Sequence, residues 1–263
     1  WVDLKHYDFV FIAIHGAYGE DGKIQAILEG LDIPFNGPGS RSSAMAMDKL
    51  LTQQLLVEAG ILVPQTMVLT SDDRESFDTS IVEYPCVIKP NQSGSSVGVT
   101  IVESVDHVEQ ALDTAFHEDD TIMIQEYVAG QELTCGIIKN QGAESLYELP
   151  PVEILTDQGF FDYHNKYQSE ETQEICPAEV SPELTTQMQD LALRVHEILG
   201  CDGLTRTDFR YNPETGKLYV LEINTIPGQT EASLCPKEAK AIGKSFAEFI
   251  KDQIELGIHA HNK

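Results

Sequence analysis

Two short stretches on either side of residue 214 carry side chains that could bind a metal ion. The first stretch, 204–210, holds Asp208, and the second, 217–224, holds Glu222 and Asn224. Carboxylate and amide oxygens are hard ligands, and Mg²⁺ usually takes one or two carboxylates and completes its shell with water and phosphate oxygens. We therefore predict a magnesium site at these three residues.

The spacing of these residues is that of a β-hairpin. Residues 212–216, Asn-Pro-Glu-Thr-Gly, are typical of a turn. Side chains alternate between the faces of a strand, and a turn centred near Glu214 pairs residues whose numbers sum to an even value. The three ligand candidates are then expected on one face, together with Arg206 and Arg210. The core-facing set would be Phe209, Leu221 and Ile223.

A charged, exposed sheet face is the plainer alternative, in which Asp208 and Arg206 form only a surface ion pair. Asn224 favours the metal site, because asparagine is uncommon in strands. The turn that follows, residues 225–230, could present backbone N–H groups beside the metal.

A loop of small residues, 90–96, reads Pro-Asn-Gln-Ser-Gly-Ser-Ser and is a candidate phosphate site. Small residues let backbone amides approach an anion, and hydroxyl groups add donors. The loop is neither a Walker sequence nor a dinucleotide fingerprint, and a plain Ser/Gly turn is the alternative. Lys49 and Lys89 stand out, because the chain has only 17 lysines and arginines. Candidates for binding adenine and ribose are Glu126, Tyr127, Val128 and Glu132.

Composition limits the classes of function. The 263 residues suit two or three subdomains. A formal net charge of −26 argues against nucleic acid as a partner, which needs a basic surface. The chain contains no run of 18 apolar residues, so we expect no membrane span. Its five scattered cysteines indicate a reducing cytoplasm. The chain starts at Trp1 without a leader, so we expect no signal peptide and a missing N-terminal segment.

Hydrophobic periodicity and turn residues predict strands alternating with helices, which indicates an α/β fold. Ser42 or Ser43 is expected to cap a helix that ends at Gly60, and Ser181 with Pro182 to open one that ends at Gly200. Residues 156–180 form a long irregular stretch, which is typical of a functional loop. The other predicted elements are strands over 8–14, 84–89, 97–102, 121–128 and 132–138, and helices over 23–30, 104–116 and 242–257.

The order of these motifs resembles that of the ATP-grasp enzymes, and specifically the D-alanine–D-alanine ligase family. The segments that carry the resemblance span nearly the whole chain. They are His-Gly-Ala-Tyr-Gly-Glu-Asp-Gly at 15–22, Ser-Ala-Met-Ala-Met-Asp-Lys at 43–49, the loop 89–98, Phe-Asp-Tyr at 161–163 with Lys-Tyr at 166–167, Arg-Thr-Asp-Phe at 206–209, Leu-Glu-Ile-Asn-Thr-Ile-Pro-Gly at 221–228, and Ser-Leu-Cys-Pro at 233–236.

The resemblance implies a two-sheet ATP-grasp fold, α/β (α+β), with three parts. Residues 1–38 would be the remainder of an N-terminal substrate-binding domain, 39–124 the central subdomain, and 125–263 the C-terminal subdomain with the metal site and a lid at 156–180. ATP would lie between the two sheets. The implied ATP contacts are Lys49, Lys89, Ser96, Gln125, Glu126, Tyr127, Val128, Glu132, Phe160 and Lys166.

The resemblance also implies the chemistry. Two D-alanines would be joined through an acyl phosphate for peptidoglycan precursor synthesis, with two Mg²⁺ (or Mn²⁺) held at Asp208, Glu222 and Asn224. Arg206 and Gly228 would stabilise the tetrahedral oxyanion, with Ser95 and Tyr167 completing the catalytic set. The dipeptide site would comprise His15, Tyr167, Arg206, Gly228, Ser233 and Leu234.

We expect small-molecule substrates, no nucleic acid, no membrane, a homodimer and a cytoplasmic location. Two positions depart from the usual pattern of the family, because Ser93 and Gln125 stand where it often has glutamate. The alternatives are a ligase that makes a D-alanyl ester with D-lactate, which Tyr167 disfavours, and an inactive ATP-binding module.

Overall fold

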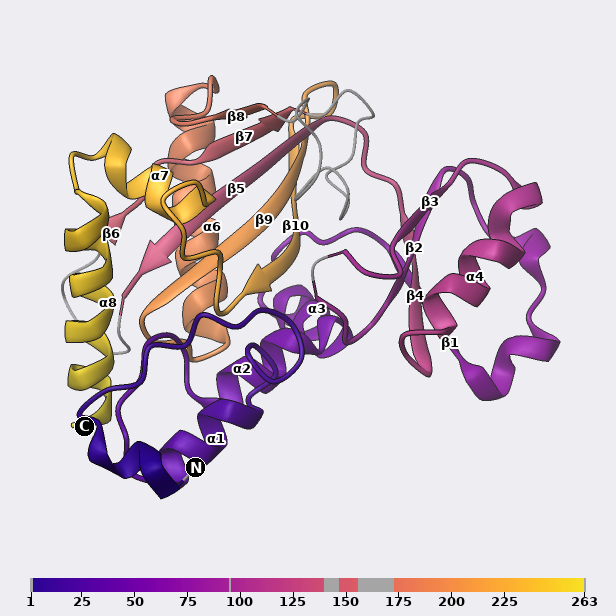
Figure 1. Ribbon diagram of the computed structural model, residues 1–263. Helices are drawn as coiled ribbons and strands as arrows, with labels where there is room; N and C mark the ends of the chain where they lie inside the picture. Colours follow the sequence, from indigo (N-terminus) through magenta and orange to yellow (C-terminus); the bar gives the residue numbers. More distant parts are fainter. Residues whose placement is uncertain (1, 95, 140–146, 156–172, 263) are drawn as a thin grey trace.

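The computed structural model describes residues 2–94, 96–139, 147–155 and 173–262. Two antiparallel sheets lie beside each other, and the first 60 residues run along the lower side of the larger sheet in Figure 1. The sequence predicts three of the four strands of the smaller sheet and three of the six strands of the larger sheet; the strands that it does not predict lie at 66–70, 147–148, 152–155 and 173–175. The arrangement of the two sheets determines which predicted site residues can meet.

The smaller sheet has the order β1-β4-β2-β3. It consists of β1 (Thr66–Thr70), β4 (Thr121–Glu126), β2 (Cys86–Pro90) and β3 (Thr100–Val102). The helix α4 (Val108–Phe116) packs on it and buries Val108, Ala111, Leu112 and Ala115 at helical spacing. Three 3-10 turns complete this half: η2 (Ser71–Ser76), η3 (Thr79–Ile81) and η4 (Val105–His107).

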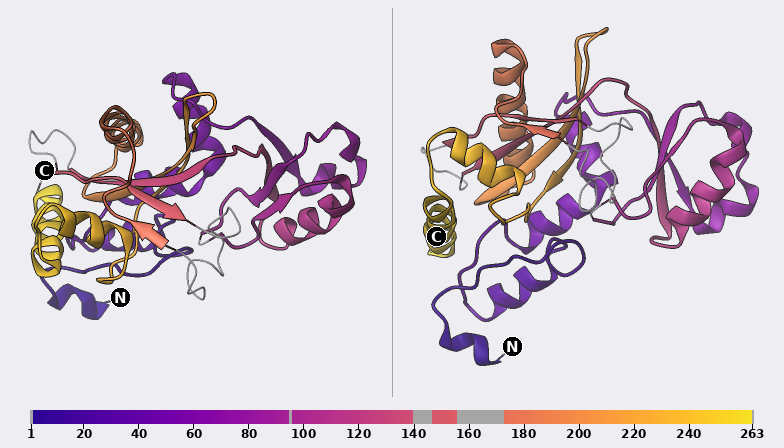
Figure 2. Two further views of the ribbon diagram at one scale, coloured as in Figure 1. Left: turned by 90° about the horizontal axis from the view of Figure 1, so that it is seen from above. Right: turned by 45° about the horizontal axis from the view of Figure 1, so that its top comes forward.

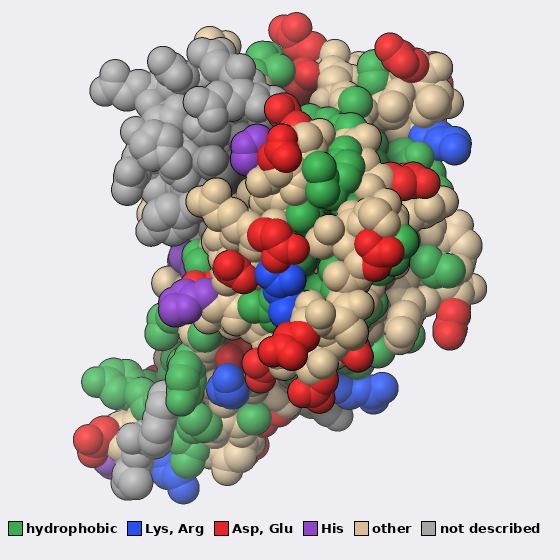
Figure 3. Space-filling model, turned by 90° about the vertical axis from the view of Figure 1, so that its right-hand side faces the viewer, with side chains coloured by type: hydrophobic (Ala, Val, Ile, Leu, Met, Phe, Trp, Pro, Cys, Tyr) green, Lys and Arg blue, Asp and Glu red, His purple; other side chains and the backbone are tan. Residues whose placement is uncertain are grey.

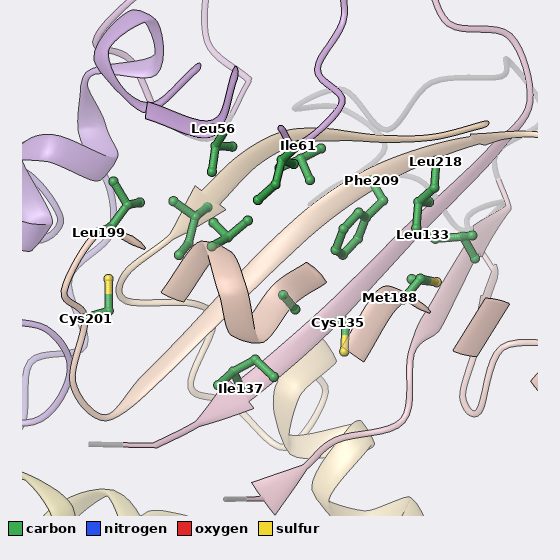
Figure 4. Close-up of a cluster of buried hydrophobic side chains, with 14 of the residues drawn as sticks. Leu56, Ile61, Leu133, Cys135, Ile137, Met188, Leu199, Cys201, Phe209 and Leu218 are labelled. Atoms are coloured by element: carbon green, nitrogen blue, oxygen red, sulfur yellow. The ribbon is translucent and has the colours of Figure 1, made fainter. Parts of the chain in front are cut away.

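The larger sheet has the order β10-β9-β5-β7-β8, with β6 paired to β5. It consists of β10 (Lys217–Asn224), β9 (Leu204–Asn212), β5 (Gln131–Ile138), β7 (Val152–Leu155), β8 (Gln173–Ile175) and β6 (Tyr147–Glu148). The helix α6 (Pro182–Ile198) begins as predicted, because the Ser181 side chain accepts a hydrogen bond from Leu184 N at 3.2 Å. It packs on the main core, where Phe209 and Met188 are fully buried (Figure 4).

The opposite face of the larger sheet is covered by α7 (Leu234–Ala241) and α8 (Phe246–His261), as the view from above shows (Figure 2). The N-terminal part contains η1 (Val2–His6), α1 (Lys23–Gly30), α2 (Ser40–Met47) and α3 (Lys49–Glu58). Within the described ranges, no helix is both long and apolar enough to cross a bilayer.

Three predicted elements differ in the structure. Residues 8–14 do not form a strand, since the backbone there makes a single bridge between Val10 and Phe35. The predicted helix ending at Gly60 is two helices, because Asp48 is extended (ψ 94°) and caps α3 by accepting from Leu51 N. Part of the predicted irregular stretch is the strand β8. Periodicity missed the break at Asp48 because the apolar pattern continues across it.

Candidate functional site

A cleft lies between the two sheets, and its open space is about 750 Å³. Strands from both sheets and the start of α3 supply its walls. Most of the predicted nucleotide and metal residues that the structure describes meet here. The lining residues are Lys49, Val87, Lys89, Ser93, Ser96, Val99, Gln125, Glu126, Tyr127, Val128, Glu132, Asp208, Arg210, Leu221 and Glu222.

The hairpin of β9 and β10 positions the carboxylates through a register shift. Near the turn, Tyr219 is opposite Arg210 and Val220 is opposite Phe209, so paired numbers sum to an odd value. A bulge at Leu221 then restores the even sum and places Glu222 opposite Asp208. Without the extra residue, Glu222 would face the opposite side of the sheet.

The predicted face is therefore right for Asp208, Glu222 and Asn224, although the turn does not pair residues in the even register. The expectation that Leu221 points to the core is wrong, because its side chain lines the cleft. Ile223 and Phe209 are buried as predicted. The bulge explains the difference, since it puts two consecutive residues of β10 toward the same cleft.

Asp208 accepts hydrogen bonds from three side chains. Arg206 donates through Nε and Nη2, each at 2.8 Å, and Asn224 Nδ2 donates to Oδ2 at 2.9 Å. Thr134 Oγ1, opposite on β5, donates to Oδ1 at 2.6 Å. Although burial opposes the charge on Arg206, the adjacent Asp208 carboxylate raises the pKa of the guanidinium above its ordinary value.

The donor set fits Mg²⁺ that is shared with phosphates better than a cage made of protein alone. Across the described ranges, no three His, Cys, Asp or Glu side chains gather into a metal-binding group. Two opposed carboxylates and one amide oxygen remain, which matches the one or two carboxylates that Mg²⁺ takes when substrate phosphates complete its shell.

Buried cations line the same cleft. Lys49 and Lys89 are only 8% and 7% exposed. Lys49 Nζ donates to Ser93 O at 2.6 Å and lies 3.8 Å from Glu222 Oε2. Burial, together with Lys49, lowers the pKa of Lys89 to about 8, against the opposing effect of Glu222. Acidic groups are widespread on the side of the molecule that the smaller sheet and α4 form (Figure 3). The cleft also contains carboxylates, but it sets two buried lysines beside them, and such a site can bind a polyanion when metal ions neutralise the carboxylates.

The other end of the cleft is formed by residues 125–132, which leave β4 and enter β5. Val128 is buried there, and Gln125 Nε2 donates to Thr66 Oγ1 at 3.1 Å. Glu132 forms an ion pair with Arg210 at 2.9 Å. This end joins an apolar edge to a carboxylate, as the sequence predicts for an adenosine site.

The predicted dipeptide residues that the structure describes are not among those that line this cleft. His15 Nδ1 is 2.9 Å from Ile226 O, which joins the N-terminal loop to the turn after β10. A Cβ on Gly228 would lie 2.6 Å from Ser233 Oγ, so this turn passes close to the start of α7. Leu234 is buried in α7.

A second cavity of about 350 Å³ adjoins the cleft and shares Lys49, Ser93 and Glu222 with it. Glu20 also lines it and was not predicted as a site residue. Its carboxylate accepts from Gly16 N at 2.6 Å and Ile226 N at 3.4 Å, and burial raises its pKa. The remaining lining residues are Ala46, Met47, Gly94, Ile223, Asn224 and Thr225.

Sequence reasoning also missed Thr134 and left Arg210 without a role. Strand parity put Arg210 on the face of Asp208, and that signal was sufficient to find it. Thr134 could not be found, because its contact with Asp208 depends on the pairing of β5 with β9. Four predicted residues lie outside the described part of the chain: Ser95, Phe160, Lys166 and Tyr167.

Comparison with protein families finds two models that match this chain. The D-ala D-ala ligase C-terminus model matches residues 55–255, and the N-terminus model matches residues 2–38. A D-alanine–D-alanine ligase of Halalkalibacterium halodurans is 41% identical over 259 residues, which cover 98% of this chain and 84% of that protein. One of Syntrophotalea carbinolica is 39% identical, covering 93% and 77%.

Solved structures that resemble this chain are also ligases. VanG D-Ala:D-Ser ligase from Enterococcus faecalis has a TM-score of 0.84 and 33% identity, covering 97% of this chain and 73% of that one. The D-alanine–D-alanine ligase from Bacillus anthracis complexed with ATP has a TM-score of 0.83 and 32% identity, covering 99% and 84%. With two antiparallel sheets around a cleft lined by buried lysines and opposed carboxylates, the chain has the ATP-grasp fold and belongs to the D-alanine–D-alanine ligase family.

Proposed function

We propose that this chain joins two D-alanines by means of ATP, with the nucleotide in the cleft between the two sheets. The convergence of buried lysines and opposed carboxylates in one cleft of a chain with a net charge of −26 carries this assignment. In a chain this acidic, the buried lysines together with metal ions held by the carboxylates would offset the negative charge of a triphosphate. Val128 and Glu132 would contact adenosine, while Lys49, Lys89 and Ser96 would contact the phosphates.

Asp208, Glu222 and Asn224 would hold Mg²⁺ or Mn²⁺, which offsets the negative charge of a phosphoryl group during its transfer. The carboxylate of the first D-alanine attacks the γ-phosphorus, and ADP leaves with the electrons of the broken P–O bond. The product is an acyl phosphate, a much better acyl donor than a carboxylate.

The amine of the second D-alanine then attacks the acyl carbon, and inorganic phosphate leaves. Arg206 is held by Asp208 through Nε and Nη2. Its Nη1 lies outside that pair and, together with the Gly228 N–H, would stabilise the tetrahedral oxyanion. One such donor is typically worth roughly 3 kcal/mol.

Release of ADP that depends on D-alanine tests the reaction. We expect ADP from ATP with D-alanine alone, and less when D-lactate or D-serine is offered as the second substrate. No ADP release with D-alanine would contradict the proposal.

Chelation tests the metal assignment. We expect EDTA to abolish ADP release, and excess Mg²⁺ or Mn²⁺ to restore it. Activity that survives thorough chelation would contradict the role of Asp208, Glu222 and Asn224 as metal ligands.

A further inference from the structure

Arg210 is a buried cation of the cleft to which the proposed reaction gives no role. It is 5% exposed and lines the cleft. On β9 it is opposite Glu132 of β5 and Tyr219 of β10, one row away from Asp208. A buried guanidinium is costly unless its surroundings bind it, so its contacts should reveal what it does.

Three contacts of Arg210 go to one segment of the chain. Its Nη2 lies 2.9 Å from Glu132 Oε2, and its Nη1 donates to Gly130 O at 3.0 Å. The guanidinium carbon is 6.0 Å from the centre of the Tyr127 ring. These three partners belong to residues 127–132, which we call the adenosine connector because it joins β4 to β5 along the cleft.

The connector also passes very close to β9. Gly130 has φ +133°, and a Cβ there would lie 2.0 Å from Tyr211 O. Only glycine can hold this conformation at this distance. The backbone is therefore fixed at Gly130, and Arg210 binds the carbonyl of that same residue and the carboxylate two positions later.

Arginine suits this arrangement because its planar fork presents separate N–H groups in fixed directions, which a lysine ammonium does not. One N–H group holds the backbone and another holds the carboxylate, so the orientation of Glu132 is coupled to that of the connector. A charge-assisted bond of this kind inside a cleft also keeps the carboxylate from turning toward the lysines at the phosphate end.

We propose that Arg210 is a positioning residue for the nucleotide, which fixes the adenosine connector so that Glu132 keeps one orientation toward the ribose hydroxyls. The chemical group that Glu132 would bind in this way is the vicinal diol of a ribonucleotide. The inference rests on the proposed contact between Glu132 and ribose.

The test compares Arg210→Met and Arg210→Lys with the unchanged chain, using ATP and 2′-deoxy-ATP. We expect Arg210→Met to raise the KM for ATP roughly tenfold while kcat and the KM for D-alanine change less than about twofold. The preference for ATP over 2′-deoxy-ATP in kcat/KM should fall toward one. Arg210→Lys should lie between, because it keeps the charge and loses the fork.

Lys217→Met is the matched control, because it removes one positive charge from an exposed position on the neighbouring strand. It should leave the KM for ATP and the nucleotide preference unchanged. An equal effect of Lys217→Met would show that net charge alone attracts the nucleotide, and would overturn the positioning role.

Glu132→Gln and the double variant Glu132→Gln/Arg210→Met separate this inference from the proposed function. If Arg210 acts through Glu132, the double variant should be no worse than Glu132→Gln alone. An unchanged KM in Glu132→Gln overturns the ribose contact itself. A raised KM in Glu132→Gln with an unchanged KM in Arg210→Met, or fully additive effects, overturns only the positioning role.

Thermal unfolding shows whether a kinetic change only reflects a less stable fold. We expect the Tm of Arg210→Lys to stay within about 3 °C of the unchanged chain, because the lysine retains the buried positive charge. Should Arg210→Met not fold, the same kinetic criteria apply to Arg210→Lys. A fall in kcat with an intact KM for ATP in that variant overturns the proposal.

Discussion

The two halves of the candidate site are built in different ways. The nucleotide half consists largely of side chains on paired strands, such as Asp208 opposite Glu222, whose positions follow from sheet register. The dipeptide half consists of loops, in which His15 and Glu20 bind the backbone of Ile226 across about 200 residues of sequence. Register is held by a whole ladder of hydrogen bonds, whereas each loop contact depends on one or two. Substitutions in the first half should therefore affect the use of ATP, and substitutions in the second half the use of D-alanine.

The largest effect is predicted for Asp208→Asn. The change removes the charge of a proposed metal ligand and the ion pair with Arg206, so kcat should fall roughly 10³-fold, about 4 kcal/mol. ADP release measures it, with the exposed Asp72→Asn as the control. Full activity in Asp208→Asn would overturn the metal assignment.

The next effect concerns the scaffold of the nucleotide half. His196 of α6 is fully buried, with its ring nitrogens 2.8 Å from Thr205 Oγ1 and 3.0 Å from Lys139 O. Burial lowers its pKa from 6.5 to about 4. Below pH 6.5 the unfolded chain takes up a proton that the folded chain does not, so stability present above pH 6.5 is lost as the pH falls toward 4.

This loss should amount to something on the order of 3 kcal/mol in the free energy of unfolding. Urea unfolding between pH 7 and pH 4 measures it, and His196→Gln should remove that part of the pH dependence. Identical slopes for the two proteins would show that His196 does not contribute.

Gly228→Ala should affect the dipeptide half alone. The new Cβ would lie 2.6 Å from Ser233 Oγ, which also binds Thr230 N, so the turn must shift. We expect kcat/KM for D-alanine to fall roughly 30-fold through misplacement of the turn, with the KM for ATP unchanged. Gly30→Ala is the control, since its Cβ would meet nothing within 4 Å. A raised KM for ATP would contradict the separation of the halves.

The smallest effect is predicted for Glu20→Gln. The glutamine keeps one oxygen acceptor for the two backbone N–H groups that Glu20 now binds. The KM for D-alanine should rise about threefold, because one loop contact is weakened. Steady-state kinetics with D-alanine as the varied substrate measure it. A fall in kcat larger than the rise in KM would place Glu20 in the chemistry instead.

Much of the fold follows from local patterns. Ser181 and Pro182 open α6, and the strands around residues 86–90, 121–126 and 131–138 lie where periodicity predicts them. The helix break at Asp48 was not predictable, because its apolar spacing is continuous and only the capping bond to Leu51 interrupts it. The division into three domains, the homodimer and the cytoplasmic location stay predictions.

The sequence by itself determined the chemistry of this protein, because residue types and motif order do not depend on how the sheets pair. It named the carboxylates, the lysines and the loops that carry the resemblance to the ligase family. The tertiary structure alone decided how they meet. A period of two cannot locate an extra residue, so only the pairing of β9 with β10 shows that Leu221 forms a bulge and turns Glu222 toward Asp208. The contact of Arg210 with Glu132 likewise depends on two strands that are distant in the chain.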